Sequence, residues 1–127
     1  MGYLMRKIIL IFLFGFLIFQ AIYADDSALS PKEWDFGKVK QGEILKHDFL
    51  FKNETRDIIN ISGLNTSCGC TVSKLDKKIL KPQEFTTINV SFDSHGYFGE
   101  VKQFIYLNTD SVVVPLVKFT IKVQVNK

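Results

Sequence analysis

Apolar and polar residues alternate along most of the chain beyond residue 30, most clearly over 44–52, 86–92 and 117–125. Successive side chains of a strand point to opposite faces, so a period of two separates an apolar face from a polar one. The last stretch places Val117, Phe119, Ile121, Val123 and Val125 on the same face. Such alternation predicts half-buried strands, each with one face in water.

Turn-forming residues separate these stretches. They cluster around Gly69 and over 37–43, 53–57, 81–84, 93–100 and 108–111. Gly and Asn tolerate the positive φ of tight turns, and Pro presets φ at a turn's first corner. The spacing predicts an all-β fold, an immunoglobulin-like antiparallel β-sandwich of about seven strands with no helix after the N-terminal segment. Because Pro115 requires an edge or a bulge, we expect the last strand to join its sheet from Leu116.

The first 24 residues have the pattern of a secretory signal. Arg6 and Lys7 precede an apolar run over 8–19, and the segment ends on a small residue, Ala24, before a polar stretch. We therefore place a signal helix at 1–24 and one sandwich domain at 25–127, which predicts export to the periplasm or the cell exterior. The alternative is an uncleaved anchor that tethers the domain to the membrane, at the short limit for a spanning helix.

Charge and motif content argue against two classes of function. The formal net charge is +3, and it falls to +1 when Arg6 and Lys7 leave with the signal. Nucleic-acid binding depends on a clustered basic face, and the densest basic stretch here, Leu75–Lys81, has the composition of a solvated loop edge. The chain contains no nucleophile elbow, zinc-protease motif or phosphate-binding loop. We therefore predict no nucleic-acid partner and no enzymatic activity.

An ordered set of short motifs carries a family resemblance. The segments WDFGKVKQGE, HDFLFKN, TSCGCT, KPQE and VSFDS follow one another within 31–125. Together they resemble the bacterial family called domain of unknown function 1573, which implies an immunoglobulin-like sandwich similar to Hydin and PapD domains. The motif positions are Phe36, Gly37, His47, Phe49, Phe51, Asn53, Ser67, Cys68, Gly69, Cys70 and Thr71. The family's P-G-E turn has Gln83 in place of glycine here, so Gln83 has to accept a glycine's backbone angle.

Cys68 and Cys70 are the only cysteines, and three interpretations of them stay open. They can pack as small apolar residues at a strand start, with Gly69 at a bulge and Ser67 and Thr71 bonding the turn. They can bind copper(I) or zinc, with His47 as a weaker additional ligand. A disulfide requires Gly69 to bend the chain, because residues i and i+2 of a flat strand lie about 6.5–7 Å apart.

The two histidines have simpler interpretations. His47 shares a face with Phe49 and Phe51, which favours a packed residue at the rim of the core. His95 lies in a predicted loop, where a solvated side chain is expected. Taken together, the sequence predicts an exported binding or structural module of the bacterial envelope that engages a protein partner through a strand edge or end loops and needs no cofactor. The alternative is a small metal-handling protein that binds copper(I) or zinc through Cys68 and Cys70.

Overall fold

The computed structural model describes residues 31–67 and 71–127. The predicted signal helix and the Cys68, Gly69 and Cys70 positions lie outside these residues. Within the described part all regular structure is β-strand, and no helix there is long and apolar enough to cross a membrane. The strands are β1 (Glu33–Lys40), β2 (Ile44–Lys52), β3 (Ile59–Thr66), β4 (Thr71–Leu75), β5 (Ile79–Leu80), β6 (Phe85–Asp93), β7 (Gly99–Thr109) and β8 (Leu116–Asn126).

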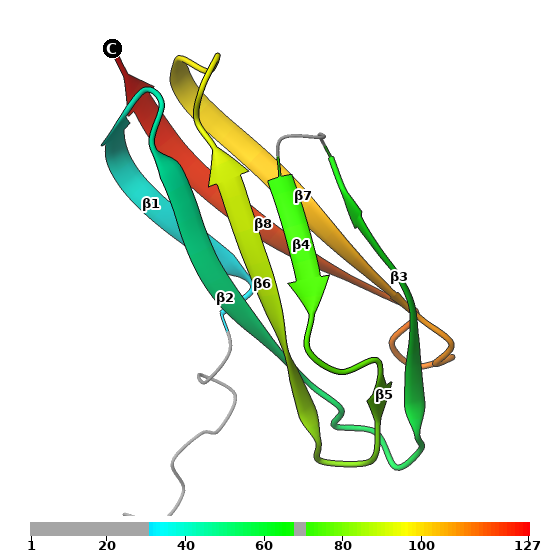
Figure 1. Cartoon of the computed structure of the whole chain (residues 1–127). Coiled ribbons are helices and arrows are strands. Elements are labelled where there is room, and N and C mark those ends of the chain that lie inside the picture. The colour runs from blue at the N-terminus through cyan, green and yellow to red at the C-terminus, as the bar shows by residue number, and fades with distance from the viewer. Residues whose placement is uncertain (1–30, 68–70) are drawn as a thin grey trace, which may run out of the picture.

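The strands form two facing sheets (Figure 1), one with the order β1-β8-β7-β3-β5 and one with the order β2-β6-β4. The predicted all-β sandwich is confirmed, with eight strands instead of about seven because the two-residue β5 is a strand of its own. The expectation of a purely antiparallel sandwich is wrong at one pair, since β1 runs parallel to β8. Parallel neighbours need a long crossover. Here the chain supplies it by passing through both sheets between β1 and β8.

The expected turn from Gly37 to Glu43 begins later than predicted. β1 continues through Gly37 to Lys40, and its pairing with β8 shifts register between Asp35 and Lys38. Gly37 has a φ of 73°, and its N–H donates to the Asp35 carboxylate at 2.8 Å. The glycine therefore serves a bulge inside a strand, since a side chain is disfavoured at that φ. As expected, β8 begins at Leu116, directly after Pro115.

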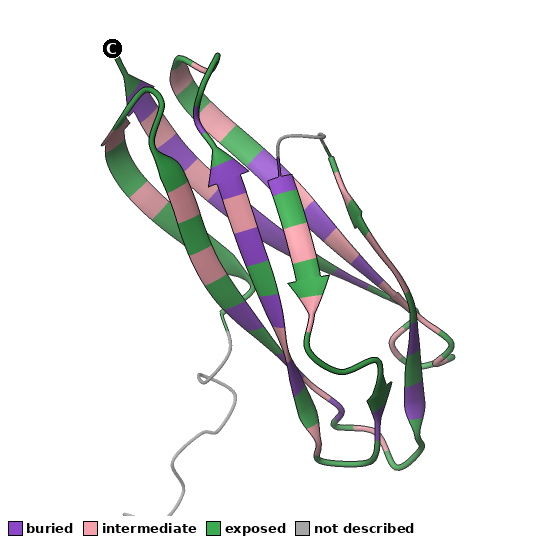
Figure 2. Cartoon of the chain, in the orientation of Figure 1, coloured by how far each residue is buried: buried purple, intermediate pink, exposed green. Residues whose placement is uncertain are grey.

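The core lies between the two sheets, and Figure 2 shows buried and exposed residues alternating along the strands. The predicted inward faces of β6 and β8 are confirmed, with every alternate residue from Ile88 to Phe92 and from Val117 to Val125 buried. Phe49, Phe92 and Phe119 are the largest fully buried side chains. Burying a side chain of this size stabilises the fold by about 1.5–3 kcal/mol.

Candidate functional site

The sandwich has two long sides, where the edge strands of one sheet lie beside the edge strands of the other. The side chains between these edge strands differ from one side to the other. On the side that we call the closed side, β1 and β2 are the edge strands, and Trp34, Phe36, His47 and Phe49 fill the seam between them. On the side that we call the open side, β4 faces β3 and β5, and a groove of about 210 Å³ lies between them. Its lining residues are Ile61, Ser62, Gly63, Leu64, Ser73, Leu75 and Lys78.

Aromatic rings cover the closed side, although the Trp34 side chain is itself 41% exposed. The Trp34 and His47 rings are parallel within 7°, with centroids 4.3 Å apart. His47 also meets the Phe49 ring edge to face, at 4.6 Å between centroids. Burial among these rings lowers the pKa of the His47 imidazole, and the nearby Asp48 carboxylate opposes this shift in part. The lowered pKa favours the neutral form of the imidazole, which packs as one more ring of the seam.

The distance of His47 from β4 bears on the predicted metal site. His47 pairs with Val90 of β6, and Val90 pairs on its other side with Ser73 of β4. Two strand spacings amount to about 10 Å, so His47 and Ser73 lie on opposite edges of this sheet. His95 is placed apart from both, in the loop after β6, where its N–H donates to the Asp93 carboxylate at 2.9 Å.

The structure brings no metal-binding cluster together among the residues it describes. Over 31–67 and 71–127, no group of three or more His, Cys, Asp or Glu side chains is arranged to hold a metal ion. Cys68 and Cys70 lie outside these ranges. Copper(I) or zinc binding by the two cysteines therefore stays a prediction of the sequence.

The edge of β4 on the open side has free backbone groups. The N–H of Asp76 donates to the Thr87 carbonyl, which fixes the alternation of bonded and non-bonded pairs between β4 and β6. By this alternation the N–H and C=O groups of Thr71, Ser73 and Leu75 point away from β6. No other described strand pairs with this edge. β4 therefore offers an unused row of donors and acceptors beside the groove.

Two hydroxyl groups on the inner face of β4 also lack partners. The Thr71 Oγ1 and Ser73 Oγ atoms are buried, and neither has a hydrogen-bond partner among the residues that the structure describes. Thr71 is only 3% exposed, and the turn that its hydroxyl was expected to bond lies outside the described residues. A buried polar group without a partner costs about 1–3 kcal/mol. Unlike the aromatic seam, the open side is thus left incomplete in its hydrogen bonding.

Ser67, the residue before Cys68, is tied to β7. Its N–H donates to the Phe104 carbonyl at 2.9 Å, and its hydroxyl accepts from the Phe104 N–H at 3.0 Å. The same hydroxyl donates to the Gln103 side-chain oxygen at 2.6 Å. Ser67 therefore fixes the end of β3 to one sheet, while Thr71 begins β4 in the other sheet.

Asn53 fastens the opposite end of the sandwich. Its fully buried amide donates to the carbonyls of Asp57 and Leu80, at 2.7 and 2.9 Å, and accepts from the Thr55 N–H. Its backbone carbonyl accepts from the N–H of Gln83, which has a φ of 70°. Gln83 thus adopts the glycine-like angle that the sequence required. The sequence marked Asn53 as a motif residue but gave no sign of its role, because Leu80 and Gln83 lie far from it in the chain.

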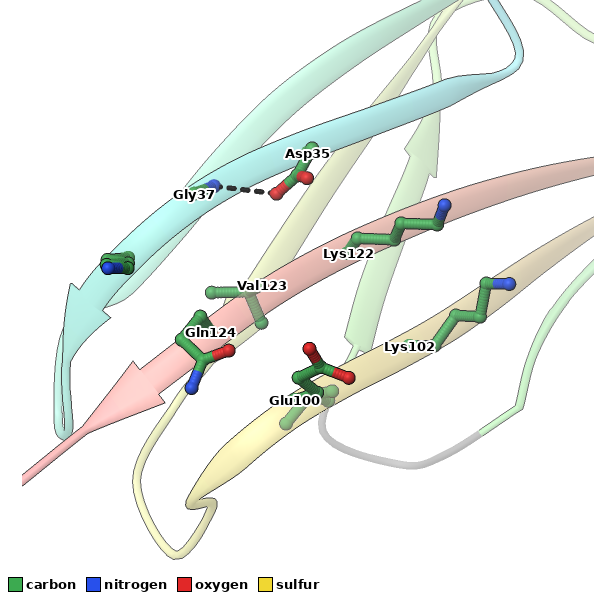
Figure 3. Close-up of a pocket in the computed structure, with 9 residues that line it drawn as sticks. Asp35, Gly37, Glu100, Lys102, Lys122, Val123 and Gln124 are labelled. Atoms are coloured by element: carbon green, nitrogen blue, oxygen red, sulfur yellow. Dashed lines mark hydrogen bonds between the residues drawn. The ribbon is translucent and has the colours of Figure 1, made fainter.

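The outer face of the larger sheet has an open hollow of about 630 Å³ over β1, β8 and β7 (Figure 3). Lys102, Lys122 and Glu100 extend over it, so that amines and a carboxylate are mixed. Lys122 also pairs with Glu33 at 2.6 Å, and this contact lowers the pKa of the Glu33 carboxyl and raises that of the Lys122 amine. Mixed and mutually paired charges are typical of a solvated sheet face.

The loop between β7 and β8 presents the most exposed apolar side chains. Val112 is 96% exposed and Val113 is 72% exposed. The base of the loop is held firmly, since the Ser111 hydroxyl accepts from the N–H groups of Val113 and Val114. Asp110 also accepts from the backbone and side-chain N–H groups of Asn60, and these hydrogen bonds lower the pKa of its carboxyl. This loop is a second candidate contact surface.

Comparison with solved structures supports the fold. A protein of unknown function from Porphyromonas gingivalis superposes with a TM-score of 0.64 at 17% identity, over 73% of this chain and 44% of that chain. The chain therefore spans less than half the length of that protein. The PapD-like domain 7 of human CEP192 gives a TM-score of 0.57 at 12% identity, over 76% of this chain and 82% of that domain. The VesB protease of Vibrio cholerae superposes with a TM-score of 0.59 at 14% identity, over 75% of this chain and 30% of that chain.

These superpositions establish a shared immunoglobulin-like, PapD-like fold. At identities this low they establish nothing about activity. No curated protein matches the chain in sequence. A family model does match, over residues 28–125, and its description is "Protein of unknown function (DUF1573)". The match includes every strand described above except the last residue of β8, Asn126. On this evidence the chain belongs to the DUF1573 family.

Proposed function

We propose that this chain is an exported immunoglobulin-like binding module of the bacterial envelope, and that it binds an extended segment of a partner protein. The segment would add as a further strand along the free edge of β4. The observation that carries the proposal is the row of backbone groups at Thr71, Ser73 and Leu75 that no described strand pairs with, beside a groove of mixed polar and apolar lining. Strand addition of this kind obtains affinity from main-chain hydrogen bonds and specificity from alternate side chains.

The other three edges are less suited to strand addition. β1 is interrupted by the bulge between Asp35 and Lys38. β5 has only two residues and covers only the first two residues of β3, and the rest of β3 has a register shift between Ile61 and Gly63. The outer face of β2 carries Lys46 and Asp48, and its seam is already filled by rings. Bulges, short strands and charges are the devices by which proteins protect sheet edges. β4 has no bulge, and Lys74 is its only charged residue.

Export rests on the first 24 residues, where a basic start precedes an apolar run. A β-lactamase reporter joined after Lys127 of the full chain tests it, because this enzyme protects cells from ampicillin only after export. We expect resistance from the full chain and sensitivity when residues 8–19 are deleted. Sensitivity of cells that make the intact fusion at equal amounts would contradict export.

Strand addition is tested with a capped synthetic peptide, Thr-Val-Thr-Gln-Thr-Val-Thr, titrated to millimolar concentration into isotope-labelled domain. We expect amide shifts at Thr71, Ser73 and Leu75. Ser73→Pro removes an N–H that points to the free edge and spares the bonds between β4 and β6, so it should abolish binding. The matched control is Lys46→Pro on the free edge of β2, which should leave binding unchanged.

Three outcomes would overturn strand addition at β4. One is equal binding by the Ser73→Pro variant. Another is a set of shifts confined to β2 or to the loop that bears Val112 and Val113. The third is the absence of any shift at β4 when the peptide is present at millimolar concentration.

A further inference from the structure

Resting on the proposed function, we infer that the segment bound along β4 is acidic on its outer face and bears hydroxyl groups on its inner face. The recognised partner is thus an extended chain in which a glutamate or aspartate lies between residues such as serine or threonine. The inference concerns side chains, whereas strand addition itself depends on the backbone, so the two can fail separately.

The acidic preference follows from unpaired amines on the open side. Lys74 lies on the outer face of β4, and Lys78 lines the groove. The ion pairs among the described residues are those of Lys77 with Glu84 and of Lys122 with Glu33. Lys74 and Lys78 therefore have no carboxylate partner in that part of the chain. The lining of the groove contains no acidic residue, so its local charge is positive.

The position of Lys74 suits a pair across the new strand. Lys74 is bonded to β6 through its backbone, so it would form a non-hydrogen-bonded pair with the residue opposite it on an added strand. Side chains of such pairs lie closer together than those of hydrogen-bonded pairs. Opposite charges directly across a pair stabilise it, and like charges destabilise it. A single acidic residue opposite Lys74 is therefore favoured. A second acidic residue nearer to Asp76 would be repelled by its carboxylate.

The hydroxyl preference follows from the inner face of the same strand. Ser73 lines the groove, and within 31–67 and 71–127 its Oγ has no hydrogen-bond partner. Thr71 Oγ1 on the same face is buried and likewise has none in those ranges. An apolar residue opposite them would leave both hydroxyls unpaired. The hydroxyl of a serine or threonine opposite them can both donate and accept a hydrogen bond, and these side chains are small. Gly63 of β3 also lines the groove and carries no side chain there.

The test uses three capped peptides on the isotope-labelled domain. The first is Thr-Val-Thr-Glu-Thr-Val-Thr, the second has Lys in place of Glu, and the third has Ala in place of every Thr. We expect the first to bind about five- to tenfold more tightly than the second, from the combined effect of attraction and repulsion at Lys74. We expect it to bind about two- to tenfold more tightly than the third, because of the hydroxyl bonds.

Two variants assign these preferences to their residues. Lys74→Glu should invert the preference between the first two peptides, and Ser73→Ala should shrink the preference of the first over the third. Equal binding of the Glu and Lys peptides at β4 would overturn the acidic inference and leave strand addition standing. Equal binding of the Thr and Ala peptides would overturn the hydroxyl inference in the same way. Absence of shifts at β4 with all three peptides would overturn the proposed function itself, and this inference with it.

Discussion

The closed and open sides of this sandwich differ in what lies between the edge strands of the two sheets. At either side, edge strands expose backbone groups, and the apolar interior between the sheets has to be covered. The closed side covers it with the rings of Trp34 and His47, whereas the open side has Ser73 and Gly63 at a groove and an unpaired edge. On the closed side, side chains of this chain fill the seam between the sheets. The other side keeps donors, acceptors and volume that a further strand would use.

Truncation of core side chains near the two seams should give the largest contrast. Phe49 is 1% exposed, and its ring packs on those of His47 and Phe119, with 5.0 Å between the centroids of the Phe49 and Phe119 rings. Phe49→Ala should lower the free energy of unfolding by about 3–5 kcal/mol, from lost burial and the cavity left behind. Leu64 at the open side is partly buried, so Leu64→Ala should cost about 1–2 kcal/mol.

Urea unfolding followed by circular dichroism measures both variants. Phe49→Leu serves as the milder control, with an expected loss of about 1–2 kcal/mol, in case the alanine variant does not fold. Similar losses for Phe49→Ala and Leu64→Ala would contradict the distinction between a filled seam and an incomplete one.

The sequence predicted the fold where the determining signal is local. The apolar faces of 86–92 and 117–125 are set by a period of two within each strand, and both faces were found as expected. The parallel partnership of β1 with β8 was missed, because it joins residues such as Trp34 and Ile121 that are far apart in the chain. Nothing in a local pattern specifies such a pair.

The candidate site was even less accessible from sequence. Ser73 and Thr71 are ordinary strand residues until the topology makes β4 an edge and leaves their hydroxyls unpaired. The stack of Trp34 on His47 likewise depends on two sheets meeting, not on either strand alone. By contrast, the strain at Gln83 was foreseen, since it followed from one residue in a motif where a glycine is usual.

A smaller effect is expected at that turn, which leads from the open-side strand β5 into β6. Gln83 has a φ of 70°, an angle that a side chain disfavours and glycine accepts. Gln83→Gly should raise the free energy of unfolding by up to about 1 kcal/mol, after allowance for the greater freedom of glycine in the unfolded chain. Gln83→Ala keeps the penalty and should change little. Urea unfolding that shows the two variants to be equally stable would exclude strain at this turn.

The smallest effect is expected at the closed side, from the titration of His47. Burial among rings lowers the pKa of this imidazole below its ordinary value of about 6.5, so the unfolded chain takes up the proton more readily than the folded one. The stabilisation that this group contributes is therefore present above the unfolded pKa, near 6.5, and declines as the pH falls from there towards the lower, folded pKa. The pKa falls because a charged imidazole packed among the rings of the seam loses the water that stabilises its charge.

His47→Phe keeps a ring in the seam and removes the titration. The difference in unfolding free energy between this variant and the unaltered chain, measured by urea unfolding from pH 8 down to pH 5, isolates the imidazole from the carboxylates. We expect the unaltered chain to lose stability relative to the variant as the pH falls below about 6.5. A constant difference across this range would show that the folded imidazole titrates as it does in the unfolded chain. The closed side would then be wetter than its geometry indicates, and the contrast between the two sides would be one of shape alone.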